Sequence, residues 1–217
     1  DTAKIISTNS MYNGLLSSRN NIEADTIQLE ADGSVGWNIR PMALLSKSST
    51  SVQADQNVYL VTTTTKASDA MRIGDITAGG KVVLRSNGDL LDATDDEAVN
   101  ITAESLSLFT SKSAGIESNR LDVKLAQESD GQVAAGNLNL QVDKNVYVDA
   151  ADDIKLGYST VGDNLHLSAT GSLVVISEAS AGKEIKLNGD QVTLIETTSL
   201  VTSDGLSQID ITSNTDM

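Results

Sequence analysis

The chain has 217 residues, no cysteine and a formal net charge of −15, with 39% hydrophobic and 3% aromatic residues. The absence of cysteine excludes disulfides and thiolate metal centres. The acidic balance argues against nucleic acid and anionic membrane surfaces as partners, since both bind clustered Lys and Arg. No apolar run approaches the roughly 20 residues that cross a bilayer as a helix, so we expect no membrane insertion.

Residues 1–50 are the least regular part of the chain, and we expect them to form irregular coils or an N-terminal cap. They contain the only tryptophan, Trp37, and the only proline, Pro41. The alternation in TIQLEADGSVGWNI (26–39) indicates that coils begin before position 50. Residues 51–217 are predicted to form one continuous repeat region of a longer protein.

In this region a short aliphatic alternation is followed repeatedly by a turn rich in Asp, Asn, Gly, Ser or Thr. Period-two alternation predicts short strands, and no stretch has the sustained apolar spacing of a helix. VTTTTK (61–66) is typical of a strand with a threonine face. Glycine supplies tight corners at AGGK (78–81), SNGD (86–89), ATGS (169–172) and LNGD (187–190).

The spacing of the alternations predicts the fold. Leu165 follows Val146 by 19 positions. Earlier, Ile101 follows Val82 by 19, and Leu121 follows Ile101 by 20. Periods of this size are typical of solenoids. We therefore predict an all-β parallel β-helix of about 19–20 residues per coil, with about eleven coils in a rod on the order of 50 Å long.

Two other folds have related signatures. A β-sandwich repeat module also places strands every 8–12 residues or so, and it is the main alternative. The very short strands, the scarcity of aromatic residues and the fixed period argue against it. A leucine-rich repeat has a similar period, but the sequence contains no segment for its helix.

Four stretches resemble the repeats of filamentous-haemagglutinin-like large exoproteins. The phrases GDITAGG and SAGIESNRLDVKL carry most of the likeness, which covers roughly residues 70–195. The stretches are GDITAGGKVVLRSNGDLLDA (74–93), NITAESLSLFTSKSAGIESNRLDVKL (100–125), AAGNLNLQVDKNVYVDAADDIKL (134–156) and NLHLSATGSLVV (164–175).

This resemblance implies a right-handed parallel β-helix within a very long bacterial adhesin, extracellular or on the bacterial cell surface. It implies a non-catalytic structural or adhesive rod segment, whose partner is a glycan or protein receptor on a host or neighbouring cell. The family's N-terminal secretion module, with its Asn-Pro-Asn motifs, has no match here. We also expect end-to-end self-association, because a parallel β-helix ends in unpaired strand edges.

Few residues offer chemistry. His166 is the only histidine, and its alternation with leucines predicts that it faces solvent. No serine lies in a nucleophile elbow, so a Ser-His-Asp triad is not indicated, and we expect no catalysis. The alternative is a polysaccharide lyase or glycoside hydrolase on a β-helix. Tyr59 and Tyr147 occupy equivalent places in DQNVYL and DKNVYV, and we expect them to face outward, either in a glycan-stacking surface or packed under a loop.

Two acidic runs, DATDDE (92–97) and DAADD (149–153), are candidate calcium sites, because Ca²⁺ binds several carboxylate and carbonyl oxygens at a bend. Neither run matches an EF-hand loop or a calcium-binding nonapeptide. The alternative is that both are solvated turns, with no cofactor. The candidate ligands are Asp92, Asp95 and Asp96 in the first run and Asp149, Asp152 and Asp153 in the second.

Overall fold

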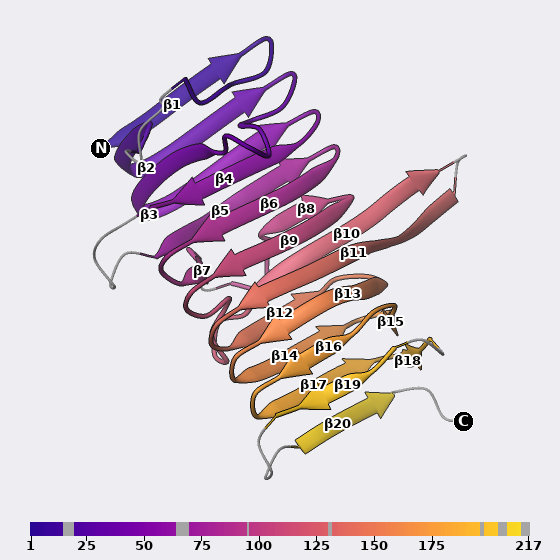
Figure 1. The fold of residues 1–217 in the computed structure, drawn as a ribbon. Helices are drawn as coiled ribbons and strands as arrows, with labels where there is room; N and C mark the ends of the chain where they lie inside the picture. The colour runs from indigo at the N-terminus through magenta and orange to yellow at the C-terminus, as the bar shows by residue number, and fades with distance from the viewer. Residues whose placement is uncertain are drawn as a thin grey trace.

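The computed structural model of the chain describes residues 1–14, 20–63, 70–94, 96–129, 132–195, 198–203 and 208–213, with the backbone alone at 127–129 and 132–133. Its strands stack in parallel as a β-solenoid of about eight turns (Figure 1). The all-β parallel fold is thus confirmed, and the β-sandwich alternative is wrong. The described part of the chain contains no helix long and apolar enough to cross a membrane.

One sheet of the solenoid begins at the N-terminus. β1 pairs with β2, and β2 with β3, so the region 1–50 already contains strands of the same stack. The strands of this sheet are β1 (Thr2–Ser7), β2 (Ile22–Ala31), β3 (Met42–Ala54), β5 (Met71–Ala78), β7 (Leu90–Asp92), β8 (Ile101–Ala103), β10 (Leu121–Ser129), β12 (Val146–Ala150), β14 (Asn164–Ala169), β17 (Glu184–Gly189) and β20 (Gln208–Ser213).

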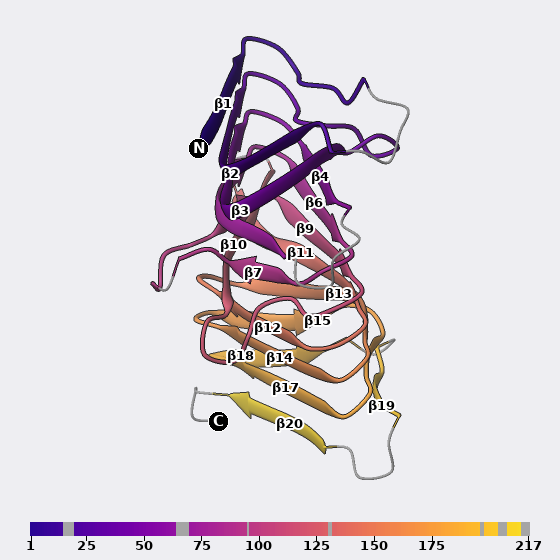
Figure 2. The same cartoon turned by 90° about the vertical axis from the view of Figure 1, so that its left-hand side faces the viewer.

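A second sheet closes the coils, and Figure 2 shows them stacked from the indigo N-terminal end to the yellow C-terminal end. β4 starts this sheet by pairing with the beginning of β3. Its strands are β4 (Val58–Thr62), β6 (Lys81–Ser86), β9 (Ser105–Thr110), β11 (Gln132–Val142), β13 (Ile154–Val161), β15 (Ser172–Val175), β16 (Ala179–Ala181), β18 (Gln191–Leu194) and β19 (Leu200–Thr202). The predicted threonine-faced strand ends as β4 at Thr62, and 64–66 lie outside the described residues.

The core consists of columns in which one aliphatic side chain per coil lies over the next. Parallel pairing places equivalent residues directly above one another, so each coil buries the inward face of its neighbour. The longest column is buried except at its last position, where Leu194 is 47% exposed. It runs through Met11, Val35, Val58, Val82, Leu106, Leu138, Leu156, Val175 and Leu194.

Hydroxyl side chains stabilise the corners where the second sheet ends. Thr62, Ser86 and Thr110 are stacked in register and buried. The Ser86 hydroxyl accepts a hydrogen bond from the Gly88 amide at 3.0 Å, and the Thr110 hydroxyl accepts one from the Lys112 amide at 3.0 Å. These bonds occupy backbone donors that would otherwise remain unpaired at the turn.

The predicted step of 19–20 holds only in the later coils. Val146 pairs with Leu165 as expected. In the earlier coils the step is wrong, because Val82 pairs with Leu106, while Ile101 lies in the other sheet. The 19 residues from Val82 to Ile101 lead from one sheet to the other and not around a full coil. Both sheets carry the same alternation, so the sequence alone does not distinguish the two cases. The longer early coils explain why there are about eight turns rather than eleven.

An internal repeat links two parts of the solenoid at a constant offset, from 11–43 to 90–122. In both copies a glycine with positive φ begins a short hairpin: Gly36 (φ 74°) and Gly115 (φ 72°). The hairpins are closed by antiparallel bridges between equivalent residues, Trp37 with Arg40 in one and Ile116 with Asn119 in the other. The repeat is also visible as NIEADTIQL (21–29) against NITAESLSL (100–108).

Beyond this region the offset grows, so that Asn57 corresponds to Asn145. The residues added in the second copy form the antiparallel pairing of β10 with β11, in which Ala126 pairs with Ala135. Figure 1 shows this hairpin extending beyond the stack. The alternation along the chain did not predict it.

The two copies lie on different columns of the solenoid. Val35 belongs to the column that passes through Val58 and Val82. Ala114, its equivalent, lies over Leu90 and Val146 instead. The repeating unit therefore does not complete a whole number of turns, and the two hairpins leave the solenoid from different faces.

Truncation of the longest column should cost stability in proportion to burial. We expect Leu138→Ala to lower the free energy of unfolding by about 2–5 kcal/mol, because it opens a cavity in the column. Leu194→Ala removes the same atoms from the exposed last position and should cost about 1 kcal/mol or less. Urea unfolding followed by circular dichroism measures both, and equal losses would contradict the stacked core.

Candidate functional site

The first hairpin is the most distinctive surface feature of the described residues. Gly36 turns the chain out of the coil in a left-handed conformation, and a Cβ there would collide with the Tyr59 carbonyl oxygen. Trp37 and Arg40 then exchange backbone hydrogen bonds of 3.0 and 2.9 Å. Because the loop between them is so short, the Trp37 side chain stays outside the core and is 56% exposed.

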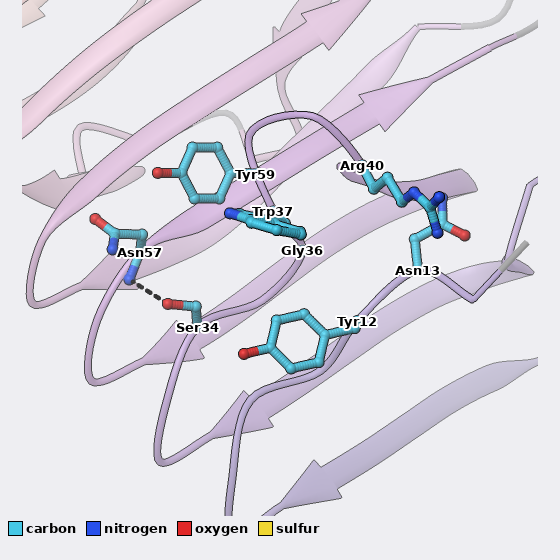
Figure 3. Close-up of a pocket in the computed structure, with 8 residues that line it drawn as sticks. All are labelled: Tyr12, Asn13, Ser34, Gly36, Trp37, Arg40, Asn57 and Tyr59. Atoms are coloured by element: carbon cyan, nitrogen blue, oxygen red, sulfur yellow. Dashed lines mark hydrogen bonds between the residues drawn. The ribbon is translucent and has the colours of Figure 1, made fainter.

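A pocket lies beside this hairpin and spans three successive coils. Tyr12, Gly36 and Tyr59 each follow a member of the longest column, on three successive coils. The two tyrosines are two coils or roughly 10 Å apart, with Gly36 on the coil between them. Figure 3 shows Trp37 between Tyr59 and Tyr12. The pocket has a volume of about 550 Å³.

Polar groups complete the lining. Asn13 Nδ2 donates to the Pro41 carbonyl at 2.9 Å, and the Asn57 amide donates to Ser34 Oγ at 3.3 Å. Both contacts hold the rim in place. The Arg40 guanidinium lies beside Asn13 (Figure 3), and it forms no ion pair with any described residue.

This combination of groups suits a polar ligand with apolar faces. The exposed rings of Tyr12 and Trp37 offer flat apolar surface with polar tips, and the largely buried Tyr59 completes the lining. Amides and a guanidinium supply directional hydrogen bonds at the rim. Among the lining residues that are described there is no carboxylate or histidine, so these side chains bind and orient without offering an acid–base pair.

The second hairpin has the same pattern of backbone hydrogen bonds as the first, but its side chains differ. Ile116 stands where the first copy has Trp37, and Leu91 where it has Tyr12. Next to this hairpin lies a pocket of about 180 Å³. Its lining contains five carboxylates and one arginine: Asp96, Glu97, Glu117, Asp122, Asp149 and Arg120. Arg120 Nη1 donates to Asp149 Oδ1 at 2.8 Å.

Asp122 is the group most affected by this crowding. Its partial burial raises its pKa to about 6, and repulsion from Asp149, Glu97, Asp92 and Asp96 adds to the effect. Both causes disfavour the charged form.

The fold separates the residues of each acidic run and brings members of the two runs together. Asp96 of the first run and Asp149 of the second meet at the acidic pocket, whereas Asp95 lies outside the described residues. Asp152 pairs instead with Lys124 at 3.4 Å, and Asp153 Oδ1 accepts from the Ser172 amide at 2.7 Å. No group of three His, Cys, Asp or Glu side chains in the described ranges stands close enough to hold a metal ion as it is.

The prediction that His166 faces solvent is wrong. It points away from the core, yet it is only 6% exposed. Its Nε2 lies 2.8 Å from Glu184 Oε2 on the next coil, and its ring meets Tyr147 edge-on at 5.0 Å. The hydrogen bond from His166 is the main cause that lowers the pKa of Glu184. Neighbouring coils cover outward side chains, which alternation within one strand does not reveal.

Tyr59 and Tyr147 occupy equivalent places in the internal repeat but lie in different sheets, and their surroundings differ. Tyr59 lines the aromatic pocket with only 7% of its surface exposed, and Tyr147 packs against His166. Sequence reasoning missed Tyr12 and Trp37 as site residues. The similarity of DQNVYL (55–60) to DKNVYV (143–148) was the available signal, because in each copy of the internal repeat this segment lies next to the hairpin.

No protein-family profile, no curated protein and no solved structure matches this chain. The resemblance to filamentous-haemagglutinin-like exoproteins therefore stays a prediction.

The acidic pocket should make stability depend on pH. EDTA is present to remove divalent cations. The protonated form of Asp122 favours the folded state, so its contribution to stability is complete below the ordinary pKa of 3.8 and is lost as the pH rises through about 6. Asp122→Asn should therefore be more stable than the native chain at neutral pH, and the difference should shrink as the pH falls to about 4. Urea unfolding across this range tests it, with Asp152→Asn as control. A difference that does not change with pH would contradict the raised pKa.

Proposed function

We propose that the chain is a non-catalytic rod segment that binds glycans through the aromatic pocket at its first hairpin. The observation that supports this most is the convergence of Tyr12, Trp37 and Tyr59 from three coils on one pocket with Arg40 at its rim. Sugar rings have an apolar C–H face and a rim of hydroxyls, which match aromatic faces bordered by hydrogen-bonding groups.

At the level of the whole protein, we propose a segment of a large bacterial surface or secreted adhesin, extracellular or on the cell surface. This rests on the repeat style of residues 70–195 and on the elongated solenoid, which carries a binding pocket on a rigid stack. Rigidity supports binding because little conformational freedom is lost when the ligand docks. A glycan on a host or neighbouring cell is the partner that this pocket supports best.

The test is a glycan array of neutral and acidic oligosaccharides, followed by calorimetry with the best hit. We expect Trp37→Ala to weaken binding by about tenfold or more, because it removes the central ring of the pocket. Ile116→Ala is the matched control, since it truncates the equivalent residue of the second hairpin and should leave binding unchanged.

Two outcomes would contradict the proposal. One is binding that survives Trp37→Ala unchanged. The other is release of reducing or unsaturated ends from the bound glycan, which would indicate a hydrolase or lyase.

The ends of the rod support self-association. The first strand exposes Ile6, and the last described strand exposes Ile209 and Ile211. Among the described strands, β1 pairs only with β2 and β20 only with β17, and a strand edge without a partner is a template for pairing with another chain. We expect sedimentation velocity to show concentration-dependent end-to-end species, and charged substitutions at Ile209 and Ile211 to suppress them. A strict monomer at high concentration would contradict this expectation.

A further inference from the structure

The acidic residues are distributed unevenly between the two sheets. The described strands of the second sheet contain no aspartate or glutamate, and their charged residues are Lys81 and Arg85 on β6 and Lys155 on β13. The first sheet carries acids along its length, for example Glu30 on β2 and Asp210 on β20. The formal net charge of −15 therefore does not describe the outer face of the second sheet.

The cations of the two sheets also differ in their partners. In the first sheet, Lys4, Lys124 and Lys186 each pair with a carboxylate, at 2.7, 3.4 and 3.0 Å. In the second sheet, Lys81 and Arg85 form no ion pair with any residue that the structure describes. Their charges remain available to an anionic ligand.

Aromatic rings hold these two cations in place instead. Lys81 Nζ lies 6.0 Å from the centroid of the Tyr59 ring, and the guanidinium carbon of Arg85 lies 4.0 Å from the centroid of the Phe109 ring. Both contacts are attractive, because a ring face carries negative electrostatic potential. Stacking engages the plane of the guanidinium and leaves its N–H edge free to donate.

This charged face is continuous with the aromatic pocket. The Lys81 amide donates to Oδ1 of Asn57, a lining residue of the pocket, at 3.0 Å. Tyr59, also a lining residue, pairs with Val83 on the next coil. Lys81 and Arg85 flank Val83 and point outward with it, since alternate residues of a strand share one face. A ligand that leaves the pocket over Tyr59 therefore meets both cations.

We propose that the glycan is acidic, and that its carboxylate-bearing sugars lie over the outer face of the second sheet against Lys81 and Arg85. This inference rests on the proposed binding of a glycan at the aromatic pocket, and it names the class of that glycan. A planar guanidinium matches a carboxylate with two parallel N–H···O bonds. Val83 lies two coils or roughly 10 Å beyond Gly36, so the ligand that reaches from the pocket to both cations is an oligosaccharide.

The remaining charges confine such a ligand to this face. Acids return at the ends of the strands, for example Glu104 before β9 and Asp143 after β11. A path across the middle of the sheet passes between them. The acidic first sheet repels a polyanion. The cations of the second sheet are few and separated, which suits one carboxylate per sugar better than dense sulfation.

The experiment measures binding of the chain to immobilised polygalacturonate, alginate, hyaluronate and polysialate by biolayer interferometry. Dextran is the neutral probe and heparin the sulfated one. We expect at least one of the four carboxylated polymers to bind. Methyl esterification of its carboxylates should weaken binding by about tenfold or more, because it removes the charge that the guanidinium recognises. Added NaCl should weaken binding as well.

Matched variants place the charge recognition on the second sheet. Arg85→Gln should weaken binding of the carboxylated polymer by about tenfold, and Arg85→Lys by less, because it keeps the charge and loses the fork. Arg72→Gln is the control, since it removes the same charge from an exposed position of the first sheet. Lys81→Gln should also weaken binding, and it provides the test if Arg85→Gln lowers the melting temperature.

Four results would overturn the proposal: no binding of any carboxylated polymer, equal affinity for the esterified form, equal losses in Arg85→Gln and Arg72→Gln, or tighter binding of heparin. Self-association in low salt that Arg85→Gln abolishes would also overturn it, because the occupant would be the acidic first sheet of another copy. If Trp37→Ala abolishes binding of a neutral glycan while Arg85→Gln has no effect, the acidic class fails and the pocket stands. Binding that depends on Arg85 and not on Trp37 would overturn the pocket instead.

Discussion

Parallel pairing in register is the constraint on which the rest of this structure depends. Because each strand lies directly over its equivalent in the previous coil, a residue type that suits one level has to suit its neighbours. The column from Met11 to Val175 satisfies this requirement with aliphatic side chains alone. Small and β-branched residues fill the narrow interior, so a chain with 3% aromatic residues still has a continuous core.

The same constraint generates the sites. Gly36 and Gly115 both have a positive φ and begin the two equivalent hairpins of the internal repeat. The side chains around each hairpin then determine the chemistry of the surface beside it. Aromatic rings line the pocket at the first hairpin, and carboxylates line the pocket at the second.

The sequence predicted the fold well and the sites poorly, for related reasons. Alternation within a strand reports which way each side chain points, and this was sufficient for an all-β parallel solenoid. It does not report which coil lies above, so Val82 was assigned the wrong partner and His166 the wrong exposure. Tyr12, Trp37 and Tyr59 are separated along the chain and meet only through stacking. Asp96 and Asp149 likewise come from different runs, and neither run alone defines their pocket.

Cysteine cross-linking tests the register most directly, because the native chain contains no cysteine. Val83 and Ser107 are outward-facing partners on β6 and β9, and Ser105 lies two positions out of register on the same face. The account predicts that a Val83→Cys, Ser107→Cys chain oxidises to an intramolecular disulfide, since Cα atoms of adjacent strands lie within bridging distance. The Val83→Cys, Ser105→Cys chain should remain reduced under the same conditions. The stacked register would be contradicted if the second pair cross-linked more readily than the first, or if neither pair cross-linked.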